Sequence, residues 1–392
     1  PATVATTGGR YFGFVVGGCL PAAMAANMLA GVWDQNAARI LSPVASSIED
    51  VCLSWLISLL GLPPKSGAGF VTGATMANFS GLAAARHALL SREGWDVESQ
   101  GLFGAPPISV IVGEEVHVSL LKALSMLGLG RDRVVRVPVD GQGRMRADAL
   151  PQIQGPTVVC IQAGNVNTGA FDPAEEICRT TRASRAWVHV DGAFGLWALA
   201  SPGRAHLARG FLQADSWATD GHKWLNVPQD SGIAFVREAG HLRAAMAASA
   251  AYLIEGQGRE PSHFTPEMSR RARGVEIWAA LRSLGRSGLA DLIERTCQHA
   301  SRFAEGLSTA GYDILNDVVL NQVLVSFGSA DVTRRVIQRV QEEGTCWCGG
   351  TEWQGHVAMR ISVSSWATTA EDVQRSLEVI LRIASEEAQA QD

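Results

Sequence analysis

The sequence has no uninterrupted apolar run as long as a membrane span. Its longest candidates, residues 20–33 and 51–62, are broken by Ser, Asn or Gly, a pattern that predicts buried helices. The start of the sequence also has no signal-peptide pattern. We therefore expect neither a membrane association nor a secreted protein. Because the first residue is Pro1 and not Met, we expect a fragment or a processed form that lacks upstream sequence.

A strong charge of one sign is also missing. Lys and Arg number 33 against 38 Asp and Glu, which gives a net charge of −5 and no electrostatic reason to expect nucleic acid as a partner. The one dense basic cluster is Arg270, Arg271 and Arg273, which a solvated helix face explains more simply than an anion site does.

Cysteine is too sparse and too scattered for a disulfide framework, since the chain has seven. Cys346 and Cys348 are the only close pair, and no second pair or histidine pattern accompanies them to complete a zinc site. We expect no metal, and reduced thiols in a cytoplasmic protein.

The pattern along the 392 residues predicts an N-terminal helical segment and two domains. Residues 1–64 are rich in small residues, and an amphipathic pattern over 47–60 ends at Pro63 and Pro64. Residues 65–288 alternate strand-like and helical runs, with a loop at 254–269 and a helix at 273–284. Residues 289–392 predict a small α+β domain with helices at 289–310, 332–343 and 370–384 and strands at 323–327 and 357–363.

The central region predicts an α/β fold with a mainly parallel sheet and helices on both faces. The predicted strands are 109–112, 134–137, 157–162, 186–190, 216–219 and 232–236, and the helices between them are 76–90, 118–127 and 174–183. The first four strands are near-continuous apolar runs, as expected for strands covered on both sides. Ligands of such a sheet bind beyond the carboxyl ends of its strands.

A lysine and an aspartate at two of these strand ends indicate the chemistry. Lys223 is at the centre of TDGHKW, residues 219–224, where a surface or ion-paired lysine would be the ordinary interpretation. Asp191 stands 32 residues upstream in HVDGAFG, residues 189–195, at the end of a predicted strand. The pair suits pyridoxal phosphate, because the lysine can form a Schiff base with the aldehyde and the acid can keep the pyridine nitrogen protonated. We therefore predict an enzyme.

Two further motifs stand before helices. In VTGATMANFSG, residues 71–81, Gly73, Ala74 and Thr75 allow backbone N–H groups to approach a phosphate, although a Thr N-cap without a ligand would have the same sequence. In GEEVHVSLLKAL, residues 113–124, His117 follows a predicted strand. A histidine in that position is usually structural, but in a pyridoxal phosphate site it could stack on the ring.

Two more motifs offer groups for a substrate or cofactor. QAGNVNTGAFDP, residues 162–173, places Asn165, Asn167 and Thr168 after another strand, and its Asp172 is more simply a helix N-cap before a proline. MRISVSSW, residues 359–366, carries Arg360 on a predicted strand. An arginine suits a substrate carboxylate, and a structural ion pair is the competing interpretation.

Together these motifs resemble the group II pyridoxal-phosphate-dependent amino acid decarboxylases, which include the aromatic amino acid and glutamate decarboxylases. The resemblance extends from RYFGFVVGG at residue 10 to MRISVSSW, and it is most specific at HVDGAFG and TDGHKW. It implies a fold-type I architecture, pyridoxal 5'-phosphate as cofactor and an L-amino acid as substrate. It also implies a homodimer whose active sites are near the subunit interface.

Carried over by position, the resemblance implies that Lys223 binds the aldehyde, Asp191 the pyridine nitrogen and His117 the face of the ring. The other implied contacts are Ala74, Thr75 and His222 around the phosphate, Ala193 on the second ring face, Asn165 beside the cofactor, Arg360 at the substrate carboxylate, and Phe12 and Phe14 in the segment that lines the substrate pocket.

The sequence departs from the family pattern in three places. The helical arm that precedes the RYFGF-like segment in relatives is absent, and dimer stability depends on it. Asp220 stands where relatives carry Asn or Ser near the phosphate, which it would repel unless turned away or protonated. No tyrosine occurs between Leu253 and Arg273, where relatives use a loop tyrosine for protonation.

The predicted reaction is therefore decarboxylation of an L-amino acid to an amine and carbon dioxide, with several alternatives open. Without the loop tyrosine the proton could come from Lys223 or His117, and His263 and Phe264 are the loop residues of related chemistry or shape. If protonation is slow, oxidative deamination could give an aldehyde instead. Transamination, or an inactive fragment that folds without a complete dimer site, are the other possibilities. Together with Phe12 and Phe14, Trp33 indicates an apolar or aromatic substrate side chain, although ordinary core packing would explain these residues as well.

Overall fold

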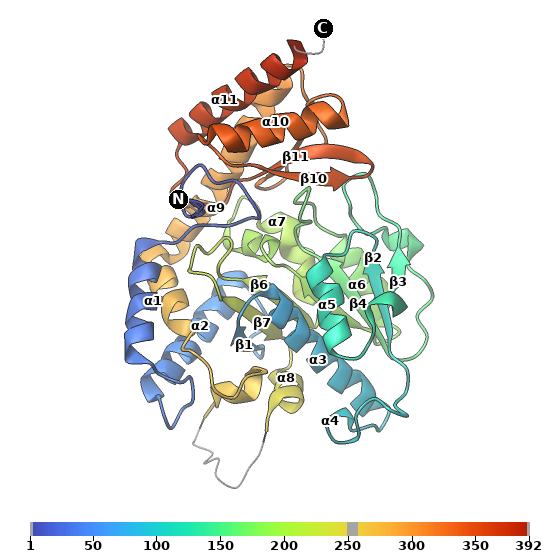
Figure 1. Cartoon of the computed structure of the whole chain (residues 1–392). Helices are drawn as coiled ribbons and strands as arrows, with labels where there is room; N and C mark the ends of the chain where they lie inside the picture. The colour runs from blue at the N-terminus through green and yellow to red at the C-terminus, as the bar shows by residue number, and fades with distance from the viewer. Residues whose placement is uncertain (1–2, 249–257, 390–392) are drawn as a thin grey trace.

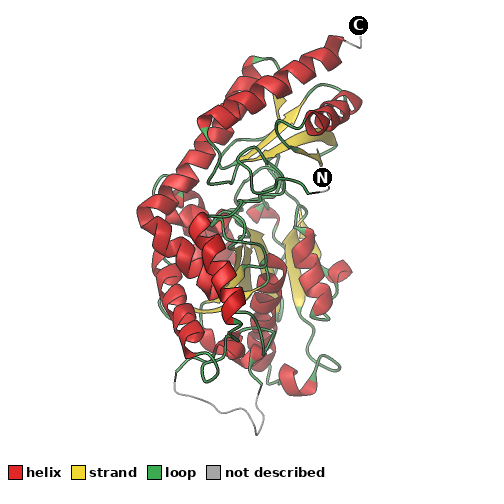
Figure 2. Cartoon of the chain, turned by 60° about the vertical axis from the view of Figure 1, so that its left-hand side comes forward, coloured by secondary structure: helices red, strands yellow, loops and turns green. Residues whose placement is uncertain are grey.

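A computed structural model describes residues 3–248 and 258–389. A large α/β domain forms the lower part of the molecule in Figure 1, and a smaller domain that contains the C-terminus lies above it. One long helix, α9 (Gly274–Thr309), runs from one domain into the other along the edge that Figure 2 turns forward.

The large domain is built on a seven-stranded sheet with the order β1-β7-β6-β5-β4-β2-β3. Neighbours from β3 to β6 are parallel, and β7 runs in the opposite direction between β6 and the edge strand β1, pairing antiparallel with both. This confirms the predicted mainly parallel sheet. The strands are β1 Gly67–Val71, β2 Ser109–Gly113, β3 Val135–Val137, β4 Thr157–Gln162, β5 Trp187–Asp191, β6 Ser216–Asp220 and β7 Gly232–Val236.

Helices cover both faces of this sheet, which explains why its central strands are apolar along their whole length. In β2, Val110 and Val112 pack with the helices of one face and Ile111 with those of the other, as the alternation of a strand requires. The helices of the large domain are α1 Pro21–Trp33, α2 Pro43–Leu60, α3 Ala74–Arg92, α4 Val97–Gln100, α5 Val118–Met126, α6 Ala174–Arg182, α7 Ala205–Ala208 and α8 Ala239–Met246.

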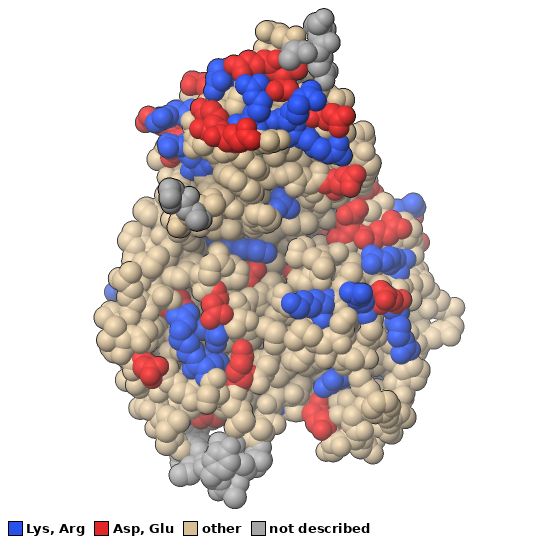
Figure 3. All heavy atoms as spheres, viewed as in Figure 1, with Lys and Arg blue, Asp and Glu red and all other residues tan. Residues whose placement is uncertain are grey.

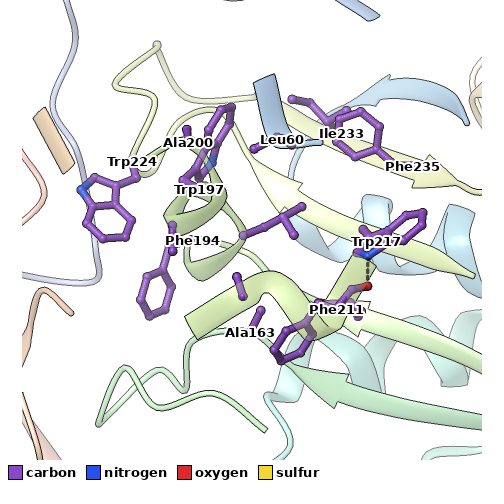
Figure 4. Packing of buried hydrophobic residues seen from close by; sticks show 14 of the residues in the cluster. Leu60, Ala163, Phe194, Trp197, Ala200, Phe211, Trp217, Trp224, Ile233 and Phe235 are labelled. Atoms are coloured by element: carbon purple, nitrogen blue, oxygen red, sulfur yellow. Dashed lines mark hydrogen bonds between the residues drawn. The ribbon is translucent and has the colours of Figure 1, made fainter. Parts of the chain in front are cut away.

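Large aromatic side chains fill the core below the predicted site. Trp197, Trp217 and Trp224 are fully buried, and Phe194 packs beside Trp224 (Figure 4). Each indole N–H has an acceptor; that of Trp217 donates to the carbonyl oxygen of Phe211 over 2.8 Å. Because buried indoles are both packed and hydrogen-bonded, they fix the positions of the segments around them.

The small domain is a four-stranded antiparallel sheet of order β10-β11-β9-β8, covered by helices on one side. Its elements are β8 Asp313–Ile314, β9 Gln322–Ser326, α10 Ala330–Glu343, β10 Gly349–Trp353, β11 His356–Ser362 and α11 Ala370–Gln389. The predicted boundary at 288/289 falls inside α9, which is kinked at Gly285, where φ is +63°. The helices predicted at 273–284 and 289–310 are therefore the two arms of one kinked helix.

The N-terminal segment differs from its prediction. The prediction of helix is confirmed over α1 and α2, but residues 3–20 are not helical. Phe12 N–H donates to the carbonyl oxygen of Trp347 over 2.8 Å, and Ser362 N–H donates to that of Phe12 over 2.9 Å. Because the small domain supplies these backbone partners, the segment extends along it although more than 300 residues separate them.

Two other expectations are modified by the structure. Part of the predicted loop at 254–269 lies outside the described residues, and the described part contains a short 3-10 helix, Pro261–Phe264. The 18-residue helix α2 has a mean hydropathy of 1.3, so by length and composition it could span a membrane, unlike the shorter apolar run at 51–62 alone. Its Glu49 is fully buried and pairs with Arg270 over 2.6 Å, which ties α2 to the rest of the large domain.

Candidate active site

Asp191 ends β5 at the carboxyl edge of the sheet, as predicted, and its carboxylate is buried. Oδ1 accepts a hydrogen bond from Ala193 N–H over 3.2 Å, and Oδ2 accepts one from Nδ2 of Asn78 over 3.0 Å. A carboxylate has about four acceptor positions, so Asp191 can still accept a hydrogen bond from a ligand.

Lys223 lies in the turn that follows β6, the neighbour of β5. Its Nζ is 3.2 Å from Oδ2 of Asp220 and 6.0 Å from the centre of the Phe194 ring. The turn is held on both sides, because Trp197 donates its indole N–H to the carbonyl oxygen of Asp220 and Trp224 donates its own to Thr296. The lysine is therefore placed by buried aromatic residues and does not extend into solvent.

The predicted phosphate cradle lies opposite this turn. Gly73 is the N-cap of α3 and Thr75 lies inside the helix, so the alternative of a Thr75 N-cap is wrong. Ala74 N–H donates to Oδ1 of Asp220 over 2.5 Å. A Cβ atom on Gly73 would lie 3.2 Å from Cε1 of His222 and 3.4 Å from Oδ1 of Asp220, so a side chain there would crowd the cradle.

His117 is at the N-cap of α5, where its Nδ1 accepts a hydrogen bond from Ser119 N–H over 3.2 Å. A neutral ring in this arrangement carries its proton on Nε2. Burial lowers the pKa of His117, and the charges next in effect are those of Asp191, Lys223 and Arg360. His117 thus caps a helix and also stands within the electrostatic reach of the other predicted site residues.

Arg360 reaches the site from β11 of the small domain. Its Nη1 donates to the carbonyl oxygen of Val166 over 3.2 Å, and burial lowers its pKa. No carboxylate in residues 3–248 or 258–389 lies within ion-pair distance of its guanidinium group, which argues against the structural ion pair. A partly buried arginine without an acid is available for an external carboxylate.

Asn165 and Ala193 flank the two central strand ends. Oδ1 of Asn165 accepts from the backbone N–H groups of Asn167 and Thr168, whereas its buried Nδ2 has no partner within the described residues. The carbonyl oxygen of Ala193 accepts Asp220 N–H over 2.9 Å, which ties the β5 end to the β6 end.

Other predicted residues lie away from this cluster. Phe12 is fully buried in the small-domain core against Phe303, so it packs there and does not line an open pocket. Phe14 is 62% exposed and stacks on Trp347, and its place near the substrate stays a prediction. Phe264 packs against Gly67 at the start of β1, the opposite end of that strand from the cradle, and His263 beside it is buried, so neither reaches Lys223 of the same chain.

One residue of the site was missed. Asn78, which contacts Asp191, is fully buried in α3. It follows Ala74 by four positions, and residues four apart lie on one helix face. That spacing, together with a polar residue in a run of small apolar ones, was the available signal.

These residues fit pyridoxal phosphate. The glycine cradle at α3 and the unpartnered Nδ2 of Asn165 are both suited to a polar ligand between the strand ends. Asp191 would hold the pyridine nitrogen, Lys223 the aldehyde carbon, and Ala74 with His222 the phosphate. The role of each residue remains a proposal.

Comparison with known proteins agrees with this arrangement. The family model for the pyridoxal-dependent decarboxylase conserved domain matches residues 6–328. The aromatic-L-amino-acid decarboxylase of Bacillus atrophaeus is 25% identical over 362 residues, which cover 86% of this chain and 72% of the relative. The L-2,4-diaminobutyrate decarboxylase of Rhizobium meliloti (strain 1021) is 28% identical over 383 residues, covering 92% of this chain and 74% of the relative.

Among solved structures, Oryza sativa TDC with PLP and tryptamine is similar in fold. The TM-score is 0.92 at 21% identity, and the match covers 98% of this chain and 85% of that one. At this identity the likeness concerns the fold alone.

Proposed function

The chain belongs to the pyridoxal-dependent decarboxylase family, and on that basis we propose that it converts an L-amino acid to the amine and carbon dioxide. It is a pyridoxal-phosphate-dependent carboxy-lyase. The observation that carries the proposal is Arg360, whose charge contributes to the lowered pKa of His117 and which has no carboxylate partner within the described part of the chain. The carboxylate of a bound substrate would supply the ion-pair partner that Arg360 lacks.

Bound pyridoxal phosphate supplies an electron-withdrawing ring that stabilises negative charge on the α-carbon of an amino acid. Asp191 would favour this by accepting a hydrogen bond from the pyridine nitrogen, for which its carboxylate has free acceptor positions. Lys223 positions the reacting amine, and the buried residues around it exclude water. The bond from the α-carbon to the carboxyl carbon breaks, carbon dioxide leaves, and a proton replaces it.

Two groups of the chain can deliver that proton. Lys223 carries it on Nζ, and neutral His117 carries one on Nε2, because its Nδ1 accepts from Ser119. Burial lowers the pKa of His117 and so favours the neutral ring, whose Nε2–H is a very weak acid. We favour Lys223 as the proton donor, with His117 orienting the substrate.

Oxidative deamination to an aldehyde remains the second candidate. It is favoured by the absence of a tyrosine between Leu253 and Arg273, a region that includes positions outside the described residues. His263 and Phe264 are too far from Lys223 in their own chain to take that place. Release of hydrogen peroxide and ammonia together with carbon dioxide would support oxidative deamination. Formation of an amine without hydrogen peroxide would support simple decarboxylation.

The deciding experiment is a screen of the common L-amino acids for carbon dioxide release with pyridoxal phosphate present. We expect release with at least one of them, and we expect Lys223→Ala to abolish both release and the visible colour of the bound cofactor. Arg360→Ala should raise KM far more than Arg360→Lys does. A wild-type protein that stays colourless with added pyridoxal phosphate would overturn the proposal and favour the inactive fragment.

We also propose that the chain works as a homodimer. Support comes from exposed apolar residues on the α1 side of the large domain, including Met28 and Val32 on α1 and Leu41 and Val44 around the start of α2. Large exposed apolar areas mark interaction surfaces, and a second copy of this chain is the partner that the family resemblance implies.

A further inference from the structure

A chain of buried side chains lies behind Asp191, on the side away from the cradle. Oδ2 of Asp191 contacts Nδ2 of Asn78 at 3.0 Å, and Oδ1 of Asn78 contacts Nε2 of His189 at 2.9 Å. Nδ1 of His189 contacts Oγ of Ser216 at 2.7 Å, and this oxygen contacts Nε1 of Trp187 at 2.8 Å. All five residues are at most 5% exposed, so no solvent interrupts the chain.

The two ends of the chain allow only one direction of donation. A carboxylate can only accept, so the NH2 group of Asn78 faces Asp191 and its Oδ1 faces His189. That oxygen can only accept, so a neutral His189 ring carries its proton on Nε2 and donates it to Asn78. Nδ1 of this ring then accepts from the hydroxyl of Ser216, which itself accepts the indole N–H of Trp187.

Two features keep the imidazole of His189 neutral and in place. Burial lowers its pKa from 6.5 to about 4, and the charge of Asp191 opposes this only in part. Gly81 of α3 leaves the space, since a Cβ atom there would lie 2.7 Å from Cε1 of His189. A glycine within a helix is less favourable than an alanine, so its presence indicates that the space is needed.

We infer that Asn78, His189, Ser216 and Trp187 are positioning residues that orient the carboxylate of Asp191 toward the pyridine nitrogen of the cofactor. The inference rests on the proposed function, because Asp191 has this role only if pyridoxal phosphate binds. The chain ends in a hydrogen bond donated to Oδ2 of Asp191, and hydrogen bonds to charged groups are the strong ones. Loss of an inner member would leave Asp191 a weaker partner for a pyridinium N–H.

The direction of donation is tested first in the cofactor-free protein. Nitrogen NMR of histidine-labelled protein at neutral pH should show His189 with its proton on Nε2. The assignment comes from the signal lost in His189→Gln. A proton on Nδ1, or a doubly protonated ring, would overturn the inferred direction whether or not the protein binds pyridoxal phosphate.

The effect on the cofactor is tested with full-length holoenzyme and pyridoxal phosphate labelled at the pyridine nitrogen. In Ser216→Ala and His189→Leu we expect the nitrogen resonance to move toward that of a neutral pyridine and cofactor affinity to fall about tenfold. His189→Gln keeps an N–H donor near the position of Nε2, and we expect it to stay close to wild type in both measurements.

The control separates this role from a loss of packing. Ser201 is fully buried like Ser216, and its Oγ donates to Oε1 of Glu294 over 2.5 Å, remote from Asp191. Ser201→Ala should lower thermal stability without moving the nitrogen resonance. Folded Ser216→Ala and His189→Leu with wild-type resonance and affinity would overturn the role. If wild type itself binds no pyridoxal phosphate, the proposed function and this role fail together. The proton position on His189 still decides the direction of hydrogen-bond donation in that case.

Discussion

Asp220 is the residue whose chemistry fits the site least well. Its carboxylate accepts Ala74 N–H over 2.5 Å and pairs with Nζ of Lys223 over 3.2 Å, so it occupies the position where a helix N-terminus would bind phosphate. A phosphate that approaches Ala74 meets this negative charge. The carboxylate must turn away or gain a proton before the phosphate can take the backbone N–H.

We therefore expect Asp220→Asn to bind pyridoxal phosphate about tenfold more tightly, because the amide removes one unit of repelling charge. The cofactor-free variant should be less stable by about 1 kcal/mol, because the partly buried pair with Lys223 is lost. Spectral titration and thermal unfolding measure the two effects. Asp172→Asn is the matched control, a buried carboxylate that accepts the N–H groups of Met145 and Gln162, and it should leave cofactor affinity unchanged. Weaker binding by Asp220→Asn would contradict the argument.

His189 gives the chain a specific sensitivity to acid. Burial lowers its pKa from 6.5 to about 4, so between these values the unfolded chain binds a proton that the folded chain does not. The stability contributed by the neutral ring is complete above pH 6.5 and falls as the pH approaches 4. The loss amounts to roughly 3 kcal/mol at most.

His189→Gln should therefore lose less stability than wild type between pH 6.5 and 4 in denaturant titrations of the cofactor-free protein. Comparing the two proteins cancels groups that they share, such as Asp172, whose pKa burial raises to about 6 and whose effect has the opposite sign. Parallel stability curves for wild type and variant would show that His189 is not the group responsible.

The central pair of the site, Asp191 and Lys223, could be predicted because both residues lie at or just after the ends of strands. Asp191 and Lys223 each follow an apolar run that changes abruptly to glycine or histidine, and adjacent parallel strands bring such ends together. The contacts of Asn78 with Asp191 and of Ser216 with His189 join separate elements at buried distances. The spacing from Ala74 places Asn78 on the same face of its helix, but nothing in the sequence says which strand that face meets, so these contacts could not be predicted.

Among the elements, residues 10–18 depend most on distant partners. Phe14 and Val15 have φ angles of +54° and +59°, which cost about 1–2 kcal/mol for residues with side chains. Stacking of Phe14 on Trp347 and burial of Val15 hold them there. At Gly17 the segment passes so close to the turn after β6 that a Cβ atom would overlap the carbonyl oxygen of Lys223.

Gly17→Ala should thus displace the Lys223 turn. We expect a loss of about 1–3 kcal/mol in the free energy of unfolding, as for an overpacked core, and a larger proportional loss of cofactor binding. Denaturant titration and spectral titration measure these. Gly240→Ala is the control, since a Cβ atom at this position in α8 meets nothing within 4 Å, and we expect it to be neutral or slightly stabilising. Wild-type cofactor affinity in Gly17→Ala would show that the segment does not position the lysine.

Dependence on residues distant in the sequence also explains which elements could be predicted. All six strands predicted for the large domain, β2 to β7, were found within one residue at each end, and most of them are short apolar runs buried on both faces. β1 was missed because its glycines weaken the strand pattern; Gly69 is there because the backbone of Phe264 packs directly on it. Residues 3–20 were wrongly assigned to a helical segment because their partners come from the other end of the sequence.

The two ends of the molecule have very different surfaces. Charged side chains gather over α10 and α11 at the top of Figure 3, where Arg335 and Arg339 pair with Glu387. The left edge in the same view, where α1 lies, is almost without charge. Along it Val32 is 82% and Leu41 is 70% exposed, although both are large apolar residues. Such a surface in water is expected to be covered, and association with a second copy covers it on both molecules.

Charges introduced on this surface should therefore separate the dimer without unfolding the chain. Met28 and Val32 are one helical turn apart on α1, and both are mainly exposed, so their replacement by Asp removes no core packing. We expect wild type to sediment as a dimer and Met28→Asp/Val32→Asp as a monomer with unchanged helix content by circular dichroism. Phe103→Asp, at a 98% exposed phenylalanine after α4, should remain a dimer, because that residue is not on the α1 surface.

A monomeric wild type would show that this surface does not pair with itself, and a dimeric double variant would place the interface elsewhere. If the proposed dimer places its active sites near the subunit interface, the double variant should also lose most of its carbon dioxide release.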